Sequence, residues 1–249
     1  MIVFKTVFIK DLTYFWRYKL NAILSWTFSL FVCIVLLYFP GLNSIVKEKG
    51  SLAIIAPYFM WLIMSSNFTI NQLISSDSIT GVIEQYYINT SDYLKLLFVR
   101  CISSATISVI PLLLFIIIIS FIAQINTQAF LCTIPIIILG IPSIWGLSLI
   151  AGSLVLRFKR IDTLISIISI ILFAGVSYFS TKSKLFAFVM PFAYASRISF
   201  SIVKNMNVTL NFMNILIIIA NSFVYLLVGI ICFRIAEKSA KKLGILGMH

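Results

Sequence analysis

CISSATISVIPLLLFIIIISFIAQINTQAFLCTIPIIILGIPSIWGLSLIAGSLVL, residues 101–156, is a run of 56 residues without a single Asp, Glu, Lys, Arg or His. A hydrocarbon core about 30 Å thick requires about 20 apolar residues per helix, so this run is long enough for two membrane spans. The polar group QINTQ, residues 124–128, lies near its middle and is suited to a turn. The run therefore predicts two consecutive transmembrane helices.

The rest of the chain continues this pattern. Hydrophobic residues make up 61% of the 249 residues and charged residues 10%, a composition far outside that of soluble globular domains. Further charge-free runs of sufficient length lie at residues 20–46, 50–76, 163–181 and 205–233. The sequence therefore predicts an all-α integral membrane protein with a single transmembrane domain over residues 1–249. Six transmembrane helices are expected, at residues 20–39, 52–75, 97–123, 129–156, 162–180 and 210–233.

The distribution of basic residues predicts the orientation. The chain has 19 Lys and Arg against 7 Asp and Glu, a net charge of +12. With both termini inside, thirteen of the basic residues fall on the cytoplasmic side and six on the other, as the positive-inside rule expects. We therefore predict a multi-pass protein of the cell membrane, plasma or inner, with both termini cytoplasmic. This topology and anionic membrane lipid account for the basic excess, and no nucleic-acid partner is expected.

The segments before the first span and after the last one are both basic. In residues 1–19, apolar residues recur at helical spacing between Phe4 and Phe15, opposite basic side chains. This pattern is typical of an amphipathic helix in the membrane interface, and we expect it to bend into the first span near Lys19. The alternative is a positively charged flank without a helix of its own. Residues 234–249 are expected to form a basic cytoplasmic tail.

The residue types that catalysis and ion-driven transport require are missing from the predicted spans. The only histidine is His249, which excludes a Ser–His dyad and an HExxH zinc motif, and no carboxylate lies at mid-membrane. No GxxxxGK[ST] phosphate-binding loop is present either. We therefore expect no enzyme activity, no metal and no cofactor on this chain, and an energy source on another polypeptide. The cysteines, which show no metal-ligand spacing, are Cys33, Cys101, Cys132 and Cys232.

The segment GVIEQYYINTSDYLKLL, residues 81–97, concentrates charge between two apolar spans. A helix over residues 77–88 would place Asp77 and Glu84 on one face and apolar side chains on the opposite face. The apolar residues of that face are Ile79, Val82, Ile83 and Tyr86. Such a short cytoplasmic helix is suited to docking in a groove of a partner, with its charges at the rim. The alternative is a loop helix exposed to solvent or lying on lipid.

This segment resembles the ABC-2-type family of ABC exporter permeases. That family has a motif of the form G-[TV]-[ILM]-E-x-[LY], followed by a turn and a short run ending in a basic residue. The matching residues are Gly81, Val82, Ile83, Glu84, Gln85 and Tyr86, followed by NTSDYLKLLFVR ending at Arg100. Ser91 stands where the family usually has proline, and Val99 where it has glycine.

The resemblance implies that the helix between spans two and three is a coupling helix, which docks on a separate ATP-hydrolysing subunit. It also implies two ATPase subunits, which bind ATP and Mg²⁺, and a second permease copy in a homodimer or heterodimer. In that family, short re-entrant helices between spans five and six close the outer mouth. Here residues 181–209 correspond, with Leu185, Pro191 and Tyr194 in a stretch too short to span. The alternative is a loop at the membrane surface.

A polar stripe follows the inner part of the second predicted span. Asn67, Asn71 and Ser75 are spaced four residues apart and share one helix face. Because amides in hydrocarbon require partners, this stripe either makes interhelical hydrogen bonds or lines a path for cargo. In the fourth span, Ser148 and Gly152 form a small-xxx-small pair that would permit close helix packing.

These features together predict the membrane-spanning permease subunit of an ATP-driven ABC exporter. A path without fixed charge suits a peptide, a drug or another amphiphilic compound. The alternatives are export of a lipid-linked polysaccharide, a secondary carrier driven by an ion gradient, and a non-transporting immunity or sensor protein of the membrane.

Overall fold

The computed structural model describes residues 2–38, 52–89, 92–123, 127–158, 161–179, 183–205 and 211–242. Within these ranges the secondary structure is helical, without a strand, which confirms the all-α prediction. The helices are α1 (Ile2–Arg17), α2 (Lys19–Tyr38), α4 (Leu52–Asn67), α5 (Ile70–Ile79), α6 (Val82–Asn89), α7 (Tyr93–Ala123), α8 (Thr127–Phe158), α9 (Asp162–Phe179), α10 (Lys184–Val189), α11 (Ala193–Asn205) and α12 (Phe212–Lys242).

Among the described residues, three helices are long and apolar enough to cross a membrane. Their apolar segments are Tyr93–Ile119 of α7, Leu131–Phe158 of α8, and Phe212–Lys242, which is α12. All three coincide with predicted spans. Shorter apolar segments occupy α2 and α9, at Ile23–Tyr38 and Thr163–Val176. The described residues thus support three membrane-length helices, and the count of six stays a prediction.

The second predicted span, residues 52–75, is not one continuous helix. It divides into α4 and α5, with Phe68 and Thr69 outside both helices. Just before this break, Ser66 Oγ and Asn67 Nδ2 both donate to the carbonyl of Ile63, at 3.0 and 2.9 Å. Such local side-chain bonds to the backbone compete with regular helical hydrogen bonding and disturb helices. The cluster SSNFT therefore offers a physical reason for the break that apolarity alone does not reveal.

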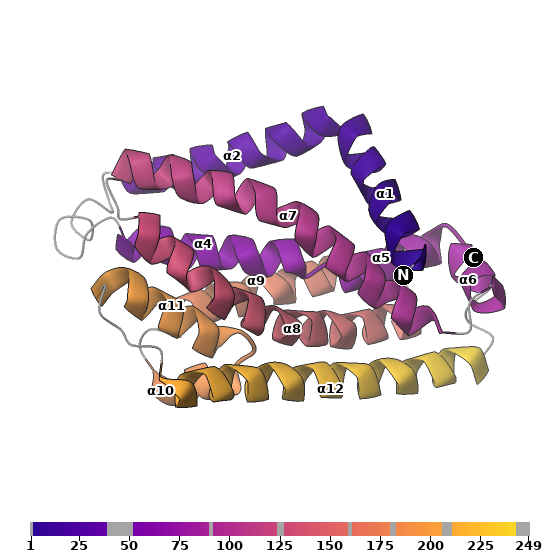
Figure 1. Cartoon of the computed structure of the whole chain (residues 1–249). Helices are drawn as coiled ribbons and strands as arrows, with labels where there is room; N and C mark the ends of the chain where they lie inside the picture. The colour runs from indigo at the N-terminus through magenta and orange to yellow at the C-terminus, as the bar shows by residue number, and fades with distance from the viewer. Residues whose placement is uncertain are drawn as a thin grey trace.

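Helix α8 is the central helix of the bundle and packs along α12 (Figure 1). The two helices meet at Gly146 and Gly229. A Cβ atom built on Gly146 would lie less than 3.0 Å from the backbone of Tyr225, and one on Gly229 would clash with the backbone of Gly146. Only glycine permits this approach, because the obstacle is main chain that cannot rotate away. The sequence pattern did not indicate this contact, since the two glycines lie far apart along the chain.

The bundle has two ends with different contents (Figure 1). The start of α1, helix α6 and the end of α12 lie at one end, called here the α6 end, and α10 and α11 lie toward the opposite end. Helix α1 joins α2 through a bend at Tyr18, one residue before the predicted position. Helix α12 continues to Lys242, so the predicted basic tail begins as part of this helix.

Candidate coupling site

The segment predicted as one helix over residues 77–88 is two helices. Helix α5 ends at Ile79, and Gly81 adopts a φ of 70° before α6 begins at Val82. The Thr80 N–H donates to the Ser76 carbonyl at 3.0 Å, and the Gly81 N–H to the Ser78 carbonyl at 3.3 Å. A left-handed glycine after the last turn is a common helix terminator. The continuous helix was therefore wrong because it carried the helical period across Gly81.

This turn separates residues that were predicted to share an apolar face. Ile83 is buried, with 1% of its surface exposed, whereas Ile79 is 70% exposed. Val82 and Tyr86 are partly buried, and Gln85 is exposed. The side chain of Glu84 lies outside the described part of the structure. Ile79 therefore belongs to the outer surface, and Ile83 to the core of this chain.

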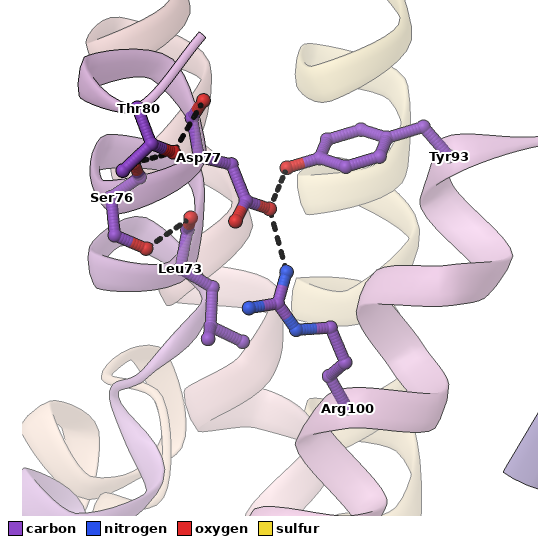
Figure 2. Close-up of polar contacts among 6 residues, drawn as sticks. All are labelled: Leu73, Ser76, Asp77, Thr80, Tyr93 and Arg100. Carbon is purple, nitrogen blue, oxygen red and sulfur yellow. Dashed lines mark hydrogen bonds and ion pairs between the residues drawn. The ribbon is translucent and has the colours of Figure 1, made fainter. Parts of the chain in front are cut away.

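Asp77 was predicted to lie on the charged outer face, but the structure buries it with 6% exposure. Its Oδ2 accepts hydrogen bonds from Tyr93 Oη at 2.9 Å and from Arg100 Nη1 at 2.6 Å (Figure 2). The Asp77 and Arg100 side chains are 9% and 15% exposed, so this is a buried ion pair between α5 and α7. A carboxylate in such a place requires these partners, because burying a lone charge is costly.

Sequence reasoning missed Tyr93 and treated Arg100 only as the end of a motif. The available signal was their spacing: seven residues apart, they share one face of α7. That face carries an acid-binding pair, and Asp77 is the nearby acid on the preceding helix. We call Asp77, Tyr93 and Arg100 the buried triad.

Tyr93 connects the buried triad to two further helices. Its side chain is 1% exposed, and its ring stacks on Tyr86 of α6 with centroids 6.0 Å apart. On another side it contacts Phe233 of α12, at 6.4 Å between centroids. Tyr93 therefore touches α6 and α12 by ring contact and α5 through Asp77. A movement of α6 would therefore act on Tyr93 through Tyr86.

Helix α1 also reaches this end of the bundle. The helix predicted for residues 1–19 is present, and Ser103 Oγ of α7 donates to Asp11 Oδ2 of α1 at 2.6 Å. A cavity of about 240 Å³ lies among α1, α6 and α7, where Asp11, Tyr86 and Arg100 are among its lining residues. The position of α1 in the membrane interface stays a prediction.

The predicted polar stripe is buried and faces other helices. Asn67, Asn71 and Ser75 are each at most 6% exposed. The Asn71 N–H donates to Ser148 Oγ at 3.2 Å, and Ser148 Oγ is 3.1 Å from Asn71 Oδ1. A Cβ on Gly152 would clash with Ile74, so α5 packs closely on α8 at the predicted small-xxx-small pair. Interhelical bonding thus accounts for Asn71, while a role of the stripe in cargo passage stays a prediction.

The predicted re-entrant segment contains two short helices, α10 and α11, joined by a turn at Pro191. Phe192 in this turn has a φ of 63°, and its ring lies where a Cβ on Gly140 would be. Leu185 is 79% exposed, and Tyr194 Oη donates to Asn214 Oδ1 at 2.9 Å. The depth of these helices in the membrane stays a prediction.

Among the residues that the structure describes, no group of three His, Cys, Asp or Glu side chains could hold a metal ion.

The family model of the CcmB protein matches residues 2–216 of this chain. The chain belongs to the CcmB protein family. CcmB proteins are membrane permease subunits of ABC transporters, and ATP hydrolysis takes place in a partner subunit. The ABC permease expectation is thereby confirmed, while the ABC-2 type is not supported. Searches of curated proteins and of solved structures found no match.

The CcmB match covers the candidate coupling site except for its contact on α12. It includes α1, the α5–α6 turn and the buried triad, and it ends within α12 before Gly229. The match therefore spans the region in which the charged residues gather, as well as most of the apolar helices. It supports a membrane-spanning subunit with an ABC ATPase as partner.

Proposed function

We propose that this CcmB-family chain is the permease half of an ATP-driven exporter, and that the α5–α6 turn receives the motion of the ATPase. The observation that carries this proposal is the buried triad directly behind α6. Tyr86 of α6 contacts Tyr93, and Tyr93 bonds Asp77, which is paired with Arg100. A partner that displaces α6 therefore acts on α5 and α7 through buried contacts.

The docking surface that we propose differs from the one expected from periodicity. Ile83 points into the core and is unavailable, whereas Ile79, Thr80 and Gln85 are exposed around the turn. An exposed isoleucine between polar groups suits insertion into an apolar pocket of a partner. We therefore assign docking to Ile79 and its neighbours, and transmission to Tyr86 and Tyr93.

The assembly that we propose has two ATPase subunits, which hold ATP and Mg²⁺, and two permease copies, either identical or sister chains. We place the α6 end in the cytoplasm, with both termini, because an ATPase is accessible there. The six spans predicted from the charge-free runs fit this arrangement. The hairpin of α10 and α11 would then lie at the outer mouth.

The cargo that we propose is an amphiphilic compound. The CcmB family implies heme export, which makes heme the first compound to test. Heme is an amphiphile with a flat apolar ring and two carboxylates. A peptide or a drug is the second class to test.

The deciding experiment compares two isoleucines with similar exposure. Ile79 is 70% exposed beside the α5–α6 turn, and Ile235 is 65% exposed on α12. We expect Ile79→Asp to reduce co-purification of the ATPase and transporter-linked ATP hydrolysis at least tenfold, while Ile235→Asp leaves both near wild type. Membrane expression of both variants is the control for folding. Wild-type ATP hydrolysis and ATPase binding by Ile79→Asp would refute the docking assignment.

A further inference from the structure

A cavity of about 1480 Å³ lies between α1, α2 and α7, and α4 and α5 complete its wall. In Figure 1, α1 and α2 meet at an angle, and both helices stand away from the middle of α7. The residues of the polar stripe do not line this cavity. Helix α5 contributes other side chains to the lining, such as Gln72 and Ser76. The cavity is therefore separate from the α5–α8 contact.

The chemistry of the cavity changes in order along α7. Arg100, Ser104, Ser108 and Phe115 all line it, so one face of the helix turns from charged to hydroxyl-bearing to apolar. At a rise of about 1.5 Å per residue, Arg100 and Phe115 are separated by roughly 22 Å along the helix. One leaflet with its headgroup region is about as deep, roughly 20 to 22 Å.

The facing helices add further charged and hydroxyl-bearing side chains to the lining. Helix α1 supplies Lys10, which lies near Arg100, and Arg17, which lies at the other end of α1, beside the bend into α2. Helix α2 supplies the hydroxyls of Ser25, Thr27 and Ser29, interspersed with apolar side chains such as Trp26 and Leu30. Among the described lining residues, Asp11 is the only carboxylate, and it already accepts a hydrogen bond from Ser103. Arg100 is paired with Asp77, so the cations outside the buried triad are Lys10 and Arg17, and these two outnumber the one carboxylate of the lining.

We propose that this cavity binds an anionic glycerophospholipid of the cytoplasmic leaflet. Its phosphate would lie along the α1 wall beside Lys10 and Arg17, its glycerol esters beside the hydroxyls, and its acyl chains against Phe115 and the neighbouring apolar wall. Basic pockets between membrane helices on the cytoplasmic side suit such headgroups. The leaflet assignment rests on the orientation proposed above, whereas the headgroup preference follows from the lining alone.

The test uses the full chain, purified and delipidated in detergent, without ATP or an ATPase. Phosphatidylglycerol and phosphatidylcholine with the same acyl chains are titrated, and bound lipid is counted by native mass spectrometry. We expect phosphatidylglycerol to bind at least tenfold more tightly. Lys10→Gln and Arg17→Gln should each weaken its binding about fivefold, since one basic residue near an anionic headgroup contributes about 1 kcal/mol.

The matched control is Lys5→Gln, which removes an exposed cation of α1 that does not line the cavity. This variant should bind phosphatidylglycerol like the wild type. Equal binding of the two lipids by the wild type, or an equal loss in Lys5→Gln and Arg17→Gln, would overturn the proposal. Displacement of the bound lipid by stoichiometric hemin would also overturn the proposal and would assign the cavity to cargo. Exclusion of the lipid by self-association of the chain would overturn it as well and would assign the cavity to a second copy. None of these results bears on the docking of the ATPase, which Ile79→Asp tests separately.

Discussion

Removing the cation from the buried triad should destabilise the protein more than removing both charges. In Arg100→Met, the Asp77 carboxylate stays buried and keeps only the hydrogen bond from Tyr93. In the double variant Asp77→Leu/Arg100→Met, no charge is left uncompensated. The comparison therefore separates the cost of an orphaned charge from the contribution of the pair.

The magnitude follows from the exposure of the pair. With 9% and 15% of the two side chains exposed and 2.6 Å between Arg100 Nη1 and Asp77 Oδ2, the pair is close to fully desolvated. Breaking such a pair from one side costs about 3–5 kcal/mol, whereas replacing both partners with apolar residues is often near neutral. The double variant still leaves the Tyr93 hydroxyl without its acceptor, at a cost of about 1–3 kcal/mol. We therefore expect the double variant to be more stable than Arg100→Met.

The assay is reversible unfolding in mixed detergent micelles, monitored by tryptophan fluorescence. The free energy of unfolding is compared between the wild type and the variants. Adding Tyr93→Phe to the double variant removes the hydroxyl that has lost Asp77 as its acceptor, and should recover about 1–3 kcal/mol. The single variant Asp77→Leu completes the set. A double variant whose loss of stability equals the sum of the losses in Asp77→Leu and Arg100→Met would show that Asp77 and Arg100 do not interact. Single losses below about 1 kcal/mol would show that the pair is solvated, as surface pairs are.

Two further predictions concern contacts between helices. Gly146→Leu or Gly229→Leu should prevent the α8–α12 contact and abolish accumulation of folded protein, whereas Gly175→Leu, whose Cβ would have no neighbour within 4 Å, should accumulate normally. Expression levels and gel-filtration profiles distinguish these outcomes. A folded Gly146→Leu variant would contradict the close approach of the two helices. Ser103→Ala should leave Asp11 without its hydrogen bond and loosen α1 from α7, seen as faster proteolysis within α1; unchanged proteolysis would show that the bond does not hold the helix.

The sequence predicted the helices well because the membrane imposes a simple requirement. A helix such as α8 must carry a long apolar run, and that run is visible without knowledge of its neighbours. The same reasoning failed where local backbone geometry decides. The break after Asn67 and the turn at Gly81 each reset the helical period, so residues assigned to one face, such as Ile79 and Ile83, end on opposite sides.

The buried triad was less predictable because it depends on how two helices meet. Asp77 was interpreted as exposed because a lone acid in an amphipathic pattern belongs to the polar face. Its burial becomes favourable only when Tyr93 and Arg100 are placed opposite it, and periodicity within a single helix contains no information about a neighbouring helix. The same limit applies to Gly146 and Gly229, which come together only when α8 and α12 pack.

The position of the buried triad has a physical rationale within the proposed function. A buried ion pair contributes little net stability compared with apolar packing, but it penalises every arrangement that separates its partners. Asp77 and Arg100 therefore hold α5 and α7 in one register, while Asn71 and Ser148 tie α5 to α8. Helix α5 is thus fixed to two membrane-length helices at the α6 end, and it is separated from α4 by the break after Asn67. A displacement of α6 should consequently move α5 together with the parts of α7 and α8 that are bonded to it. This group of helices can then rotate against α4 at the break after Asn67.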